Sequence, residues 1–250
     1  MKKNNVKLAV ILAAGMGQRL RKIESEMPKG FIHLGGITLI ERVIRQLKHN
    51  NIEKIIIVTG YKAEYYNELK KKYHFVETVH NGDYQRSGSM YSLYCAKQLI
   101  GKNSFLLLES DLLFESRAIE SLLLFPESNA ILISSETKAG DEVFVSTKGN
   151  LFHCMSKEKD SLPNITGELV GISLISSQLF EIMKIYAISF FEKDLMLDYE
   201  YCLNAISDQT DIFFHKIDNL IWTEIDDPEQ FNRAQKIIYP NILDKECKED

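Results

Sequence analysis

Several residue types that would direct a protein toward a particular class are scarce in this sequence. The 250 residues contain four cysteines, which form no CxxC pair and no Cys/His cluster at the spacing of a zinc site: Cys95, Cys154, Cys202 and Cys247. This scarcity argues against a disulfide framework and is typical of reduced thiols. No apolar run approaches the length of a membrane span. We therefore expect a cytoplasmic protein without a membrane partner.

Positive charge is not in excess either. Thirty Lys and Arg residues face 35 Asp and Glu residues, so the formal net charge is -5, and the pI is near 5.8. This balance argues against a surface that coats nucleic acid, although it allows a local cationic pocket for a small anion. No repeat, low-complexity stretch or clear linker is present. One domain over residues 1–250, with a core at about 6–238, is the simplest organisation.

Continuous apolar runs alternate with helical patterns in the first half of the chain. The runs predict strands that are buried on both faces, as in a parallel sheet. Strands are expected at residues 7–13, 54–59, 75–79 and 105–109, and helices at 38–49, 63–72 and 89–100. The alternation indicates an α/β fold with an open, mostly parallel sheet and helices on both faces.

The pattern changes after about residue 135. Two alternating segments, 142–146 and 151–155, flank Lys148-Gly149-Asn150 and predict a β-hairpin. Further elements are expected as strands at 169–175, 212–216 and 221–225, and as helices at 178–186, 195–206 and 228–238. The charged tail at 243–250 is expected to be frayed.

A glycine loop follows the first strand. It reads Leu12-Ala13-Ala14-Gly15-Met16-Gly17, and Arg19 comes two residues later. Glycines allow consecutive backbone N–H groups to turn toward an anion, and open α/β sheets bind ligands beyond the carboxyl ends of their strands. Leu20 takes the third glycine position of a dinucleotide fingerprint, and a Walker lysine is missing. A tight structural turn is the alternative to a phosphate site.

The string LAAGMGQRL, followed by Met27-Pro28-Lys29, resembles the signature of the nucleotide-sugar-type nucleotidyltransferases. The intervening LRKIESEM departs from the commoner spelling of this family. The resemblance implies that the loop holds a triphosphate, which Arg19 and Lys29 neutralise. It also implies a Rossmann-like, GT-A-like nucleotidyltransferase fold with a small hairpin and helical insertion.

Two acidic clusters lie where strands end. Glu109 and Asp111 follow one buried run, and in an extended chain their side chains point the same way. Asp226 belongs to the distant string WTEIDD, and Asp227 is its register alternative. Paired carboxylates suit Mg²⁺, although solvated loop acids are the more common meaning of such residues. The family resemblance matches Asp111 and Asp226 to its two metal-binding aspartates.

Motifs across residues 6–238 resemble the 2-aminoethylphosphonate cytidylyltransferases, with the bacterial phosphocholine cytidylyltransferases as close relatives. The matching strings are MPKGFIHLGG, GSMYSLY, LLLESDLLFE, GDEVFV, MSK, GELVGIS and WTEIDD. The resemblance implies Mg²⁺-dependent transfer of CMP from CTP to a small phosphonate or phosphate. An acceptor-binding insertion is expected at about 136–210.

The candidate site residues follow from this resemblance and from the loops above. Catalytic roles are expected for Arg19, Lys29 and Lys157, and metal binding for Asp111 and Asp226. Nucleotide binding is expected at Leu12, Ala13, Ala14, Gly15, Met16, Gly17, Gly60, Ser87, Gly88 and Ser89. Acceptor binding is expected at Glu168, Asp141, Asp198 and Glu200. Ser87 or Ser89 is also a candidate helix N-cap.

The identity of the acceptor stays open at this point. A primary ammonium donates hydrogen bonds and favours carboxylates, whereas a quaternary choline head favours an aromatic cage. The single tryptophan, Trp222, mildly disfavours a Trp-rich cage. Transfer to a sugar 1-phosphate and a non-catalytic nucleotide-binding regulator are remoter alternatives. The sequence also leaves a homodimer open.

Overall fold

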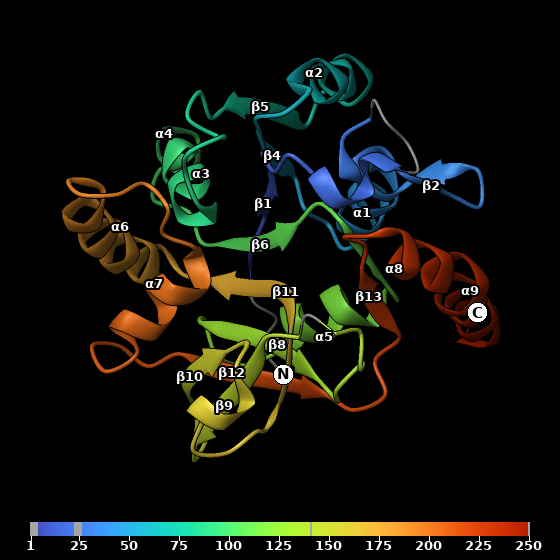
Figure 1. The fold of residues 1–250 in the computed structure, drawn as a ribbon. Helices are drawn as coiled ribbons and strands as arrows, with labels where there is room; N and C mark the ends of the chain where they lie inside the picture. Colours follow the sequence, from blue (N-terminus) through green and yellow to red (C-terminus); the bar gives the residue numbers. More distant parts are fainter. Residues whose placement is uncertain (1–4, 23–26, 141, 250) are drawn as a thin grey trace.

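A computed structural model describes residues 5–22, 27–140 and 142–249. Its centre is a nine-stranded sheet in the order β5-β4-β1-β6-β11-β8-β12-β10-β9 (Figure 1). The strands of this sheet are β1 Leu8–Ala13, β4 Lys54–Thr59, β5 Val76–His80, β6 Phe105–Glu109, β8 Ala130–Ser134, β9 Phe144–Lys148, β10 Leu151–Ser156, β11 Gly167–Ile175 and β12 Phe213–Ile217. Two small antiparallel pairs stand apart, β2 His33–Leu34 with β3 Ile37–Thr38, and β7 Leu112–Phe114 with β13 Trp222–Glu224.

The first half of the sheet is parallel. Strand β1 lies between β4 and β6, and β4 also pairs with β5. All six residues of β1 are buried. Alternate residues enter opposite cores, since Ile11 packs into one cluster and Val10 into the other. This double burial explains the continuous apolar run in the sequence.

The second half of the sheet is mixed. Strand β11 runs antiparallel to both β6 and β8, while β12 is parallel to β8. The hairpin β9–β10 closes the far edge, and β9 also pairs with β11. The expectation of a mostly parallel sheet therefore holds for the half that carries the glycine loop, and the fold class is the expected α/β class. Segment 136–210 includes β11, a central strand.

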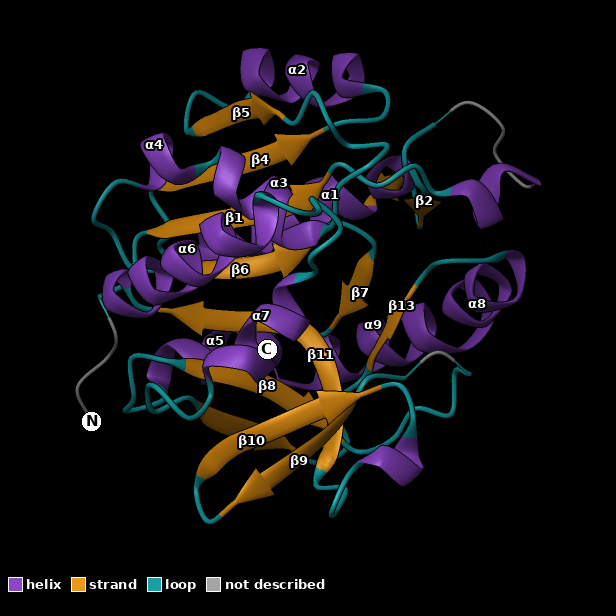
Figure 2. Ribbon diagram, turned by 60° about the vertical axis from the view of Figure 1, so that its left-hand side comes forward, coloured by secondary structure: helices purple, strands orange, loops and turns teal. Residues whose placement is uncertain are grey.

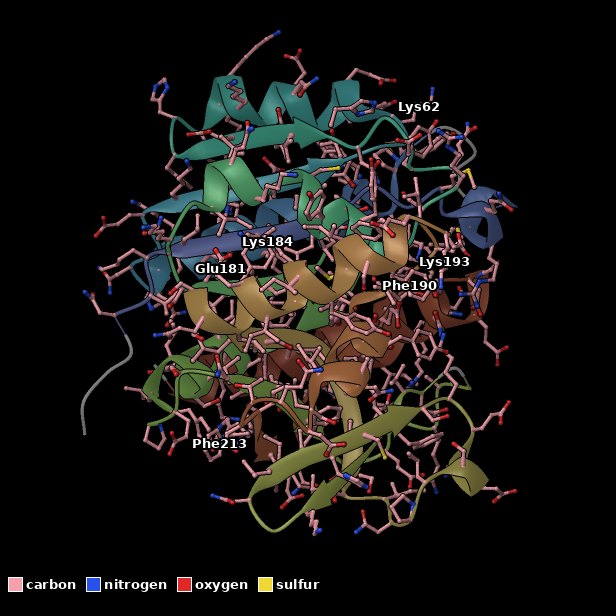
Figure 3. The ribbon with its side chains drawn as sticks, turned by 90° about the vertical axis from the view of Figure 1, so that its left-hand side faces the viewer. Lys62, Glu181, Lys184, Phe190, Lys193 and Phe213 are labelled. Carbon is pink, nitrogen blue, oxygen red and sulfur yellow. The ribbon has the colours of Figure 1, made fainter. Side chains whose placement is uncertain are left out.

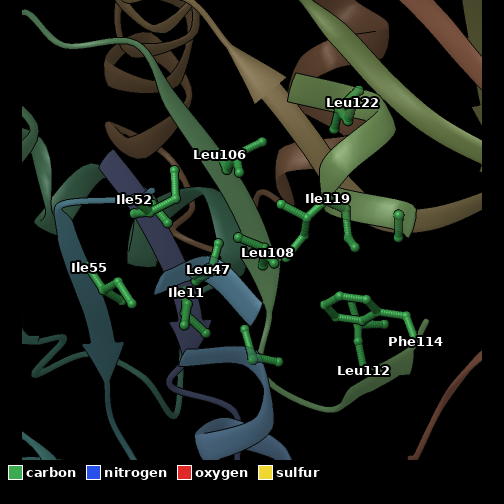
Figure 4. Packing of buried hydrophobic residues seen from close by; sticks show 14 of the residues in the cluster. Ile11, Leu47, Ile52, Ile55, Leu106, Leu108, Leu112, Phe114, Ile119 and Leu122 are labelled. Atoms are coloured by element: carbon green, nitrogen blue, oxygen red, sulfur yellow. The ribbon is translucent and has the colours of Figure 1, made fainter. Parts of the chain in front are cut away.

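Helices cover both faces of the sheet (Figure 2). One core cluster includes side chains of α1 Leu39–His49, α2 Ala63–Lys72 and α5 Arg117–Leu124; Figure 4 shows part of its packing. The opposite cluster includes side chains of α3 Ser89–Cys95, α4 Lys97–Ile100, α6 Ser177–Phe191 and α7 Tyr199–Ile206. On α6, Lys184 donates to Glu181 at 2.8 Å, and both residues are labelled in Figure 3.

The C-terminal helices correct one expectation. Helix α8 Pro228–Arg233 continues through a π-helical stretch, Ala234–Ile238, into α9 Tyr239–Glu249. The tail is therefore helical to Glu249, not frayed. Ile242 is fully buried, and Glu246 accepts hydrogen bonds from Arg42 and from the backbone of Ser116. These contacts hold the tail against the end of α1.

Within the described residues, no helix has both the length and the apolar character needed to cross a membrane.

Candidate active site

The glycine loop leaves β1 at the centre of the parallel half. The backbone N–H of Ser110 donates to Leu12 O at 3.1 Å, which ties the loop to the end of β6. Gly17 has a φ of +55°, and a Cβ there would lie 2.9 Å from Cγ of Lys29. Glycine is needed at this position for both its backbone conformation and its lack of a side chain. The missing side chain of Gly17 thus leaves room for the Lys29 side chain to pack against the loop.

Gly60, which follows β4, packs behind the loop. A Cβ on Gly60 would lie 2.6 Å from Ala14 O and 2.5 Å from Cβ of Tyr84. The neighbouring Tyr61 N–H donates to Ala14 O at 3.3 Å. These contacts make Gly60 a close-packing residue that supports the predicted nucleotide loop.

The predicted cations and predicted metal-binding acids form one network. Lys29 Nζ lies 2.8 Å from Asp111 Oδ2 and is also ion-paired with Asp226. Arg19 forms an ion pair with the second oxygen of Asp226. Burial alone would lower the pKa of Lys29, but Asp111 and Asp226 outweigh it and raise that pKa well above its usual value. Lys29 therefore stays charged between two acids.

Pairing between β7 and β13 brings the two acids together across 115 residues of sequence. Trp222 pairs with Phe114 and Glu224 with Leu112, and the Ile225 N–H donates to Asp111 O at 3.1 Å. Asp226 follows directly and is 7% exposed.

Asp227, the alternative to Asp226 as the predicted metal-binding acid, instead caps a helix. Its Oδ1 accepts the backbone N–H groups of Glu229 and Gln230, both at 2.9 Å, and it caps α8. Asp226 is consequently the acid that joins Asp111.

A cavity of about 340 Å³ opens beside this network. Seven of the predicted nucleotide-binding residues line it: Leu12, Ala13, Ala14, Gly15, Ser87, Gly88 and Ser89. Lys29, Asp111, Asp198 and Glu200 line it as well, whereas Met16, Gly17, Gly60 and Arg19 are not among its lining residues. The cavity thus joins the glycine loop, the Ser87–Ser89 turn and the charged network.

The Ser87–Ser89 turn is held by the segment before α7. Gly88 N–H donates to Leu195 O at 2.8 Å, and a Cβ on Gly88 would collide with the carbonyl of Leu197. The Ser89 N–H donates to Asp198 Oδ1 at 2.9 Å, and the Ser89 hydroxyl lies 3.2 Å from the same oxygen. The amide proton at this helix start therefore binds Asp198, and the turn is braced before any ligand enters.

Three further acids lie near this cavity: Glu109 and Glu200 line it, and Glu224 has an oxygen within 4.8 Å of one of Glu109. Burial, with Glu200 and Asp111 next, raises the pKa of the Glu109 carboxyl well above its usual value. Burial, then Asp111 and Glu109, raises the pKa of Glu224 to about 10. Burial raises the pKa of Glu200 to about 7, and Lys157 opposes this shift. Lys29 and Lys157 offset these shifts only in part, so the cluster of acids indicates a place for further positive charge.

A smaller cavity of about 80 Å³ continues from this acidic wall. Glu109, Glu200 and Glu224 line it together with Lys157 and Glu168. The oxygens of Glu168 accept from Thr137, at 2.6 Å from its N–H and 3.0 Å from its hydroxyl. Lys157 and Glu200 also line an adjoining cavity of about 220 Å³. Glu200 is therefore common to all three cavities, and the predicted acceptor residue Asp141 lies outside the described residues.

The acids fit a divalent cation on their chemistry. Asp111 Oδ1 is buried and has no hydrogen-bond partner among the described residues, while its other oxygen faces Lys29. One oxygen each of Glu109, Asp111 and Glu224 lie within 4.8 Å of one another. Carboxylate oxygens are the protein ligands that Mg²⁺ prefers. Glu109 and Glu224 thus offer carboxylate oxygens beside Asp111, one of the two predicted metal-binding acids.

Sequence reasoning did not select four residues of this site. Glu109 and Glu224 were visible as acids two positions from Asp111 and Asp226, which is the spacing of one strand face. Tyr199 donates to Glu109 Oε1 at 2.7 Å, and buried Asn81 binds the Ser87 hydroxyl at 2.9 Å. The roles of Tyr199 and Asn81 carry no local signal in the sequence, because each depends on contacts between segments that are apart in the chain.

Comparison with known proteins adds a family. The sequence profile described as the MobA-like NTP transferase domain matches residues 9–163. The chain is 39% identical to a choline-phosphate cytidylyltransferase of Streptococcus pneumoniae over 108 residues, 43% of this chain and 46% of that protein. It is 32% identical to a 2-aminoethylphosphonate cytidylyltransferase of Lancefieldella rimae over 111 residues, 44% and 45% of the two chains.

Another relative matches over a longer part of the chain, at lower sequence identity. The chain is 25% identical over 234 residues to a bifunctional IPC transferase and DIPP synthase of Thermococcus kodakarensis, covering 92% of this chain and 50% of that protein. The matches thus span about half the length of these relatives.

Solved structures share the fold. An inositol-1-phosphate CTP transferase from T. maritima superposes with a TM-score of 0.83 at 20% identity, over 97% of both chains. A CTP:phosphocholine cytidylyltransferase from Streptococcus pneumoniae superposes with a TM-score of 0.77 at 22% identity, over 93% of this chain and 99% of that one.

Proposed function

The chain belongs to the MobA-like NTP transferase family, and we propose that it is a cytidylyltransferase that condenses CTP with 2-aminoethylphosphonate. The products would be CMP-2-aminoethylphosphonate and pyrophosphate. The observation that carries this proposal is the cavity that joins the glycine loop to an acid-lined recess through the Lys29, Asp111 and Asp226 network.

The glycine loop and its cations suit the triphosphate. Gly15 lines the cavity, and open space surrounds the position that its Cβ would take. Lys29 is charged and points into the cavity wall, and Arg19 is 60% exposed next to Asp226. Both cations would offset phosphate charge once the nucleotide binds.

Asp111 and Asp226 would hold Mg²⁺, and Asp111 has one oxygen within 4.8 Å of oxygens of Glu109 and Glu224. When bound, the ion supplies positive charge to the phosphate oxygens at which negative charge develops. The partnerless Asp111 Oδ1 supports this assignment. In this proposal the carboxylates that raise one another's pKa would ionise to receive the ion.

The acidic recess suits a primary ammonium. Glu109, Glu200 and Glu224 line a space of only about 80 Å³. A primary ammonium donates three hydrogen bonds to such acids, whereas a trimethylammonium donates none and is larger. Lys157, which lines this recess and the adjoining cavity, would bind the phosphonate. The acceptor would thus lie with its amine inward and its phosphonate toward the nucleotide.

In this arrangement a phosphonate oxygen attacks the α-phosphorus of CTP in line. A bond forms between the acceptor oxygen and the α-phosphorus. The bond between the α-phosphorus and the oxygen that bridges it to the β-phosphorus breaks, and pyrophosphate leaves with that oxygen. The acceptor oxygen is anionic at neutral pH, so the protein's residues act mainly by positioning and by charge stabilisation. Lys157 orients the acceptor, and Lys29 and Arg19 stabilise charge on the leaving group.

Phosphocholine is the competing acceptor. The 39% identity to a choline-phosphate cytidylyltransferase over 108 residues favours it, and Trp222 and Tyr201 are aromatic rings that line the smaller cavities. The acids that dominate the recess favour the primary amine. A cytoplasmic location and a homodimer stay predictions.

The decisive experiment incubates the protein with Mg²⁺, either CTP or UTP, and one acceptor at a time, and measures pyrophosphate release. The acceptors are 2-aminoethylphosphonate, phosphocholine and inositol 1-phosphate. We expect the highest kcat/KM for CTP with 2-aminoethylphosphonate. A higher value for phosphocholine would reassign the acceptor. CTP binding without turnover of any acceptor would instead indicate a nucleotide-binding regulator.

A further inference from the structure

Asn81, directly after β5, is the buried polar residue that organises the Ser87–Ser89 turn. Its side chain is fully buried, and its backbone N–H donates to Thr59 O at 2.8 Å. A fully buried amide that uses all its hydrogen-bonding groups holds one orientation.

The contacts of Asn81 fix which end of its amide faces the cavity. Its Oδ1 accepts a hydrogen bond from the backbone N–H of Asp83 at 2.9 Å. The Nδ2 group of Asn81 could not take this place, because it donates hydrogen bonds and does not accept them. The Nδ2 group must therefore point the other way. There it donates to the hydroxyl oxygens of Ser87 at 2.9 Å and Ser92 at 3.0 Å.

This orientation decides the roles of the two hydroxyls. A serine oxygen that accepts from Asn81 still has its own proton to donate. The Ser92 proton is directed to Gly88 O at 3.5 Å. The Ser87 hydroxyl has no acceptor among the residues that the structure describes, and Ser87 lines the 340 Å³ cavity. Ser87 therefore presents a donor to whatever ligand enters.

The position of Ser87 suits contact with a base. Asp111 follows β6, and the segment with Ser87 follows β5, three strands away in the sheet. With strands about 4.8 Å apart, the ends of β5 and β6 are separated by roughly 14 Å, and the glycine loop after β1 leaves the sheet between them. A nucleotide whose phosphates lie at Lys29 and Asp111 would bring its base toward Ser87.

We infer that Asn81 and Ser87 set the preference for cytosine over uracil: Asn81 holds the Ser87 hydroxyl as a donor, and N3 of cytosine accepts its proton. Uracil carries a proton on its own N3, so Ser87 could meet it only with the one lone pair that Asn81 leaves on its oxygen, and the Ser87 proton would then lose its partner on the base. This inference rests on the proposed function because it assumes that a pyrimidine nucleotide occupies the cavity. Ser87 is the contact residue, and Asn81 is a positioning residue.

The first test reverses the polarity of Asn81 without changing its shape. In Asn81→Asp, the carboxylate accepts protons from both serine hydroxyls, so Ser87 turns its lone pairs toward the cavity. The ratio of CTP to UTP affinity, measured by calorimetry without an acceptor, should fall by roughly tenfold to a hundredfold. The matched control is Asn103→Asp, at an exposed position before β6, which should leave the ratio unchanged.

The second test does not depend on the folding of Asn81→Asp. The analogue 3-deaza-CTP replaces N3 of cytosine with a C–H group. The wild-type protein should bind this analogue about tenfold or more weakly than CTP, and Ser87→Ala should bind the two nucleotides alike. The same variant should also lose most of the discrimination between CTP and UTP.

The outcomes separate this inference from the proposed function. If Ser87→Ala keeps the wild-type discrimination against 3-deaza-CTP, the inference is overturned, even if CTP is turned over. If the wild-type protein binds CTP and UTP alike, it is overturned as well. If no acceptor is turned over but discrimination depends on Ser87, the inference is supported and the cytidylyltransferase assignment fails. Failure to bind either nucleotide overturns both.

Discussion

The two halves of the nine-stranded sheet differ in how their strands pair and in the charges that they carry. The half from β5 to β6 is parallel throughout, and the segments after β1 and β5, which contain Gly15 and Gly88, line the 340 Å³ cavity. The half from β11 to β9 is mostly antiparallel and lines the recess whose wall carries Glu168 and Lys157. The parallel half offers backbone groups and small side chains to the cavity, and the other half offers Glu168 and Lys157 to the recess, which also receives Glu109 from the end of β6.

This difference separates a general function from a specific one. Backbone groups and glycines bind a triphosphate whatever it is joined to, whereas the charges in the recess select the second substrate. Lys29, Asp111 and Asp226 lie where the halves meet, held by the pairing of β7 with β13. Substitutions in the parallel half, in the mostly antiparallel half and at the junction should therefore change different properties: nucleotide binding, acceptor binding and turnover.

The largest effect is expected at the junction. Asp111→Ala should reduce turnover about a thousandfold, because it removes a carboxylate proposed to hold the metal and leaves Lys29 with Asp226 alone. Initial rates and a thermal melt of the same sample would measure it. The exposed Asp208→Ala serves as control. Full activity of Asp111→Ala with an intact fold would refute the proposed metal site.

A smaller and more selective effect is expected in the antiparallel half. Lys157→Ala should raise the acceptor KM roughly tenfold to a hundredfold and leave CTP affinity within about twofold, because Lys157 lines only the two smaller cavities. The control is Lys159→Ala, whose ammonium pairs with Glu136 at 2.7 Å on the surface. Weakened CTP binding with unchanged acceptor KM would contradict the division between the halves.

The parallel half was also the more predictable half. The apolar runs placed β4 and β6 at residues 54–59 and 105–109, and the helical pattern placed α2 at 63–72, with the bounds that the structure shows. Strands buried on both faces leave an uninterrupted apolar run, and helices leave a period of 3.6 residues, so local sequence suffices. The glycine loop was visible for the same reason, since its backbone demands specific residues.

The site was predictable only in part. Asp111 and Asp226 carry a family resemblance, but their approach depends on the β7–β13 pairing, which no local pattern encodes. The role of Asn81 depends on Ser87, Ser92 and Asp83 together, and a lone asparagine after a strand reads as an ordinary turn residue. The tail was expected to fray because it is charged and terminal. The contacts that hold it, such as Glu246 with Arg42, join opposite ends of the chain and leave no local pattern.

A moderate pH effect is expected where the cavities meet. Glu200 has a pKa raised to about 7, so its proton is lost as the pH rises from 6 to 8. If the ionised group attracts the ammonium of the acceptor, kcat/KM for the acceptor should rise several-fold over this range, by a factor of about ten at most. Glu200→Gln should flatten the rise. Because the acceptor phosphonate also titrates, the difference between the two proteins is the informative quantity. An equal rise in both would show that Glu200 does not sense the acceptor.

The smallest effect concerns stability. Glu224 has a pKa raised to about 10 in the folded protein, above its usual value of 4.5, so the folded state keeps a proton that the unfolded state loses. The contribution of this group to stability is therefore greatest below pH 4.5 and falls as the pH rises toward 10. Glu224→Gln cannot lose that proton, and it should raise the melting temperature at pH 8 by roughly 2–4 °C, about 1 kcal/mol, but not at pH 5.

Thermal melts at both pH values, without divalent cations, would measure this change. The exposed Glu229→Gln on α8 is the control and should shift neither melt. A lower melting temperature for Glu224→Gln at pH 8 would mean that an ionised Glu224 already has a stabilising partner. Lys29 would be that partner, because it is the cation that opposes the shift. Lys29 would then neutralise the negative charge of the recess, and the acids would no longer favour an acceptor that carries an ammonium group.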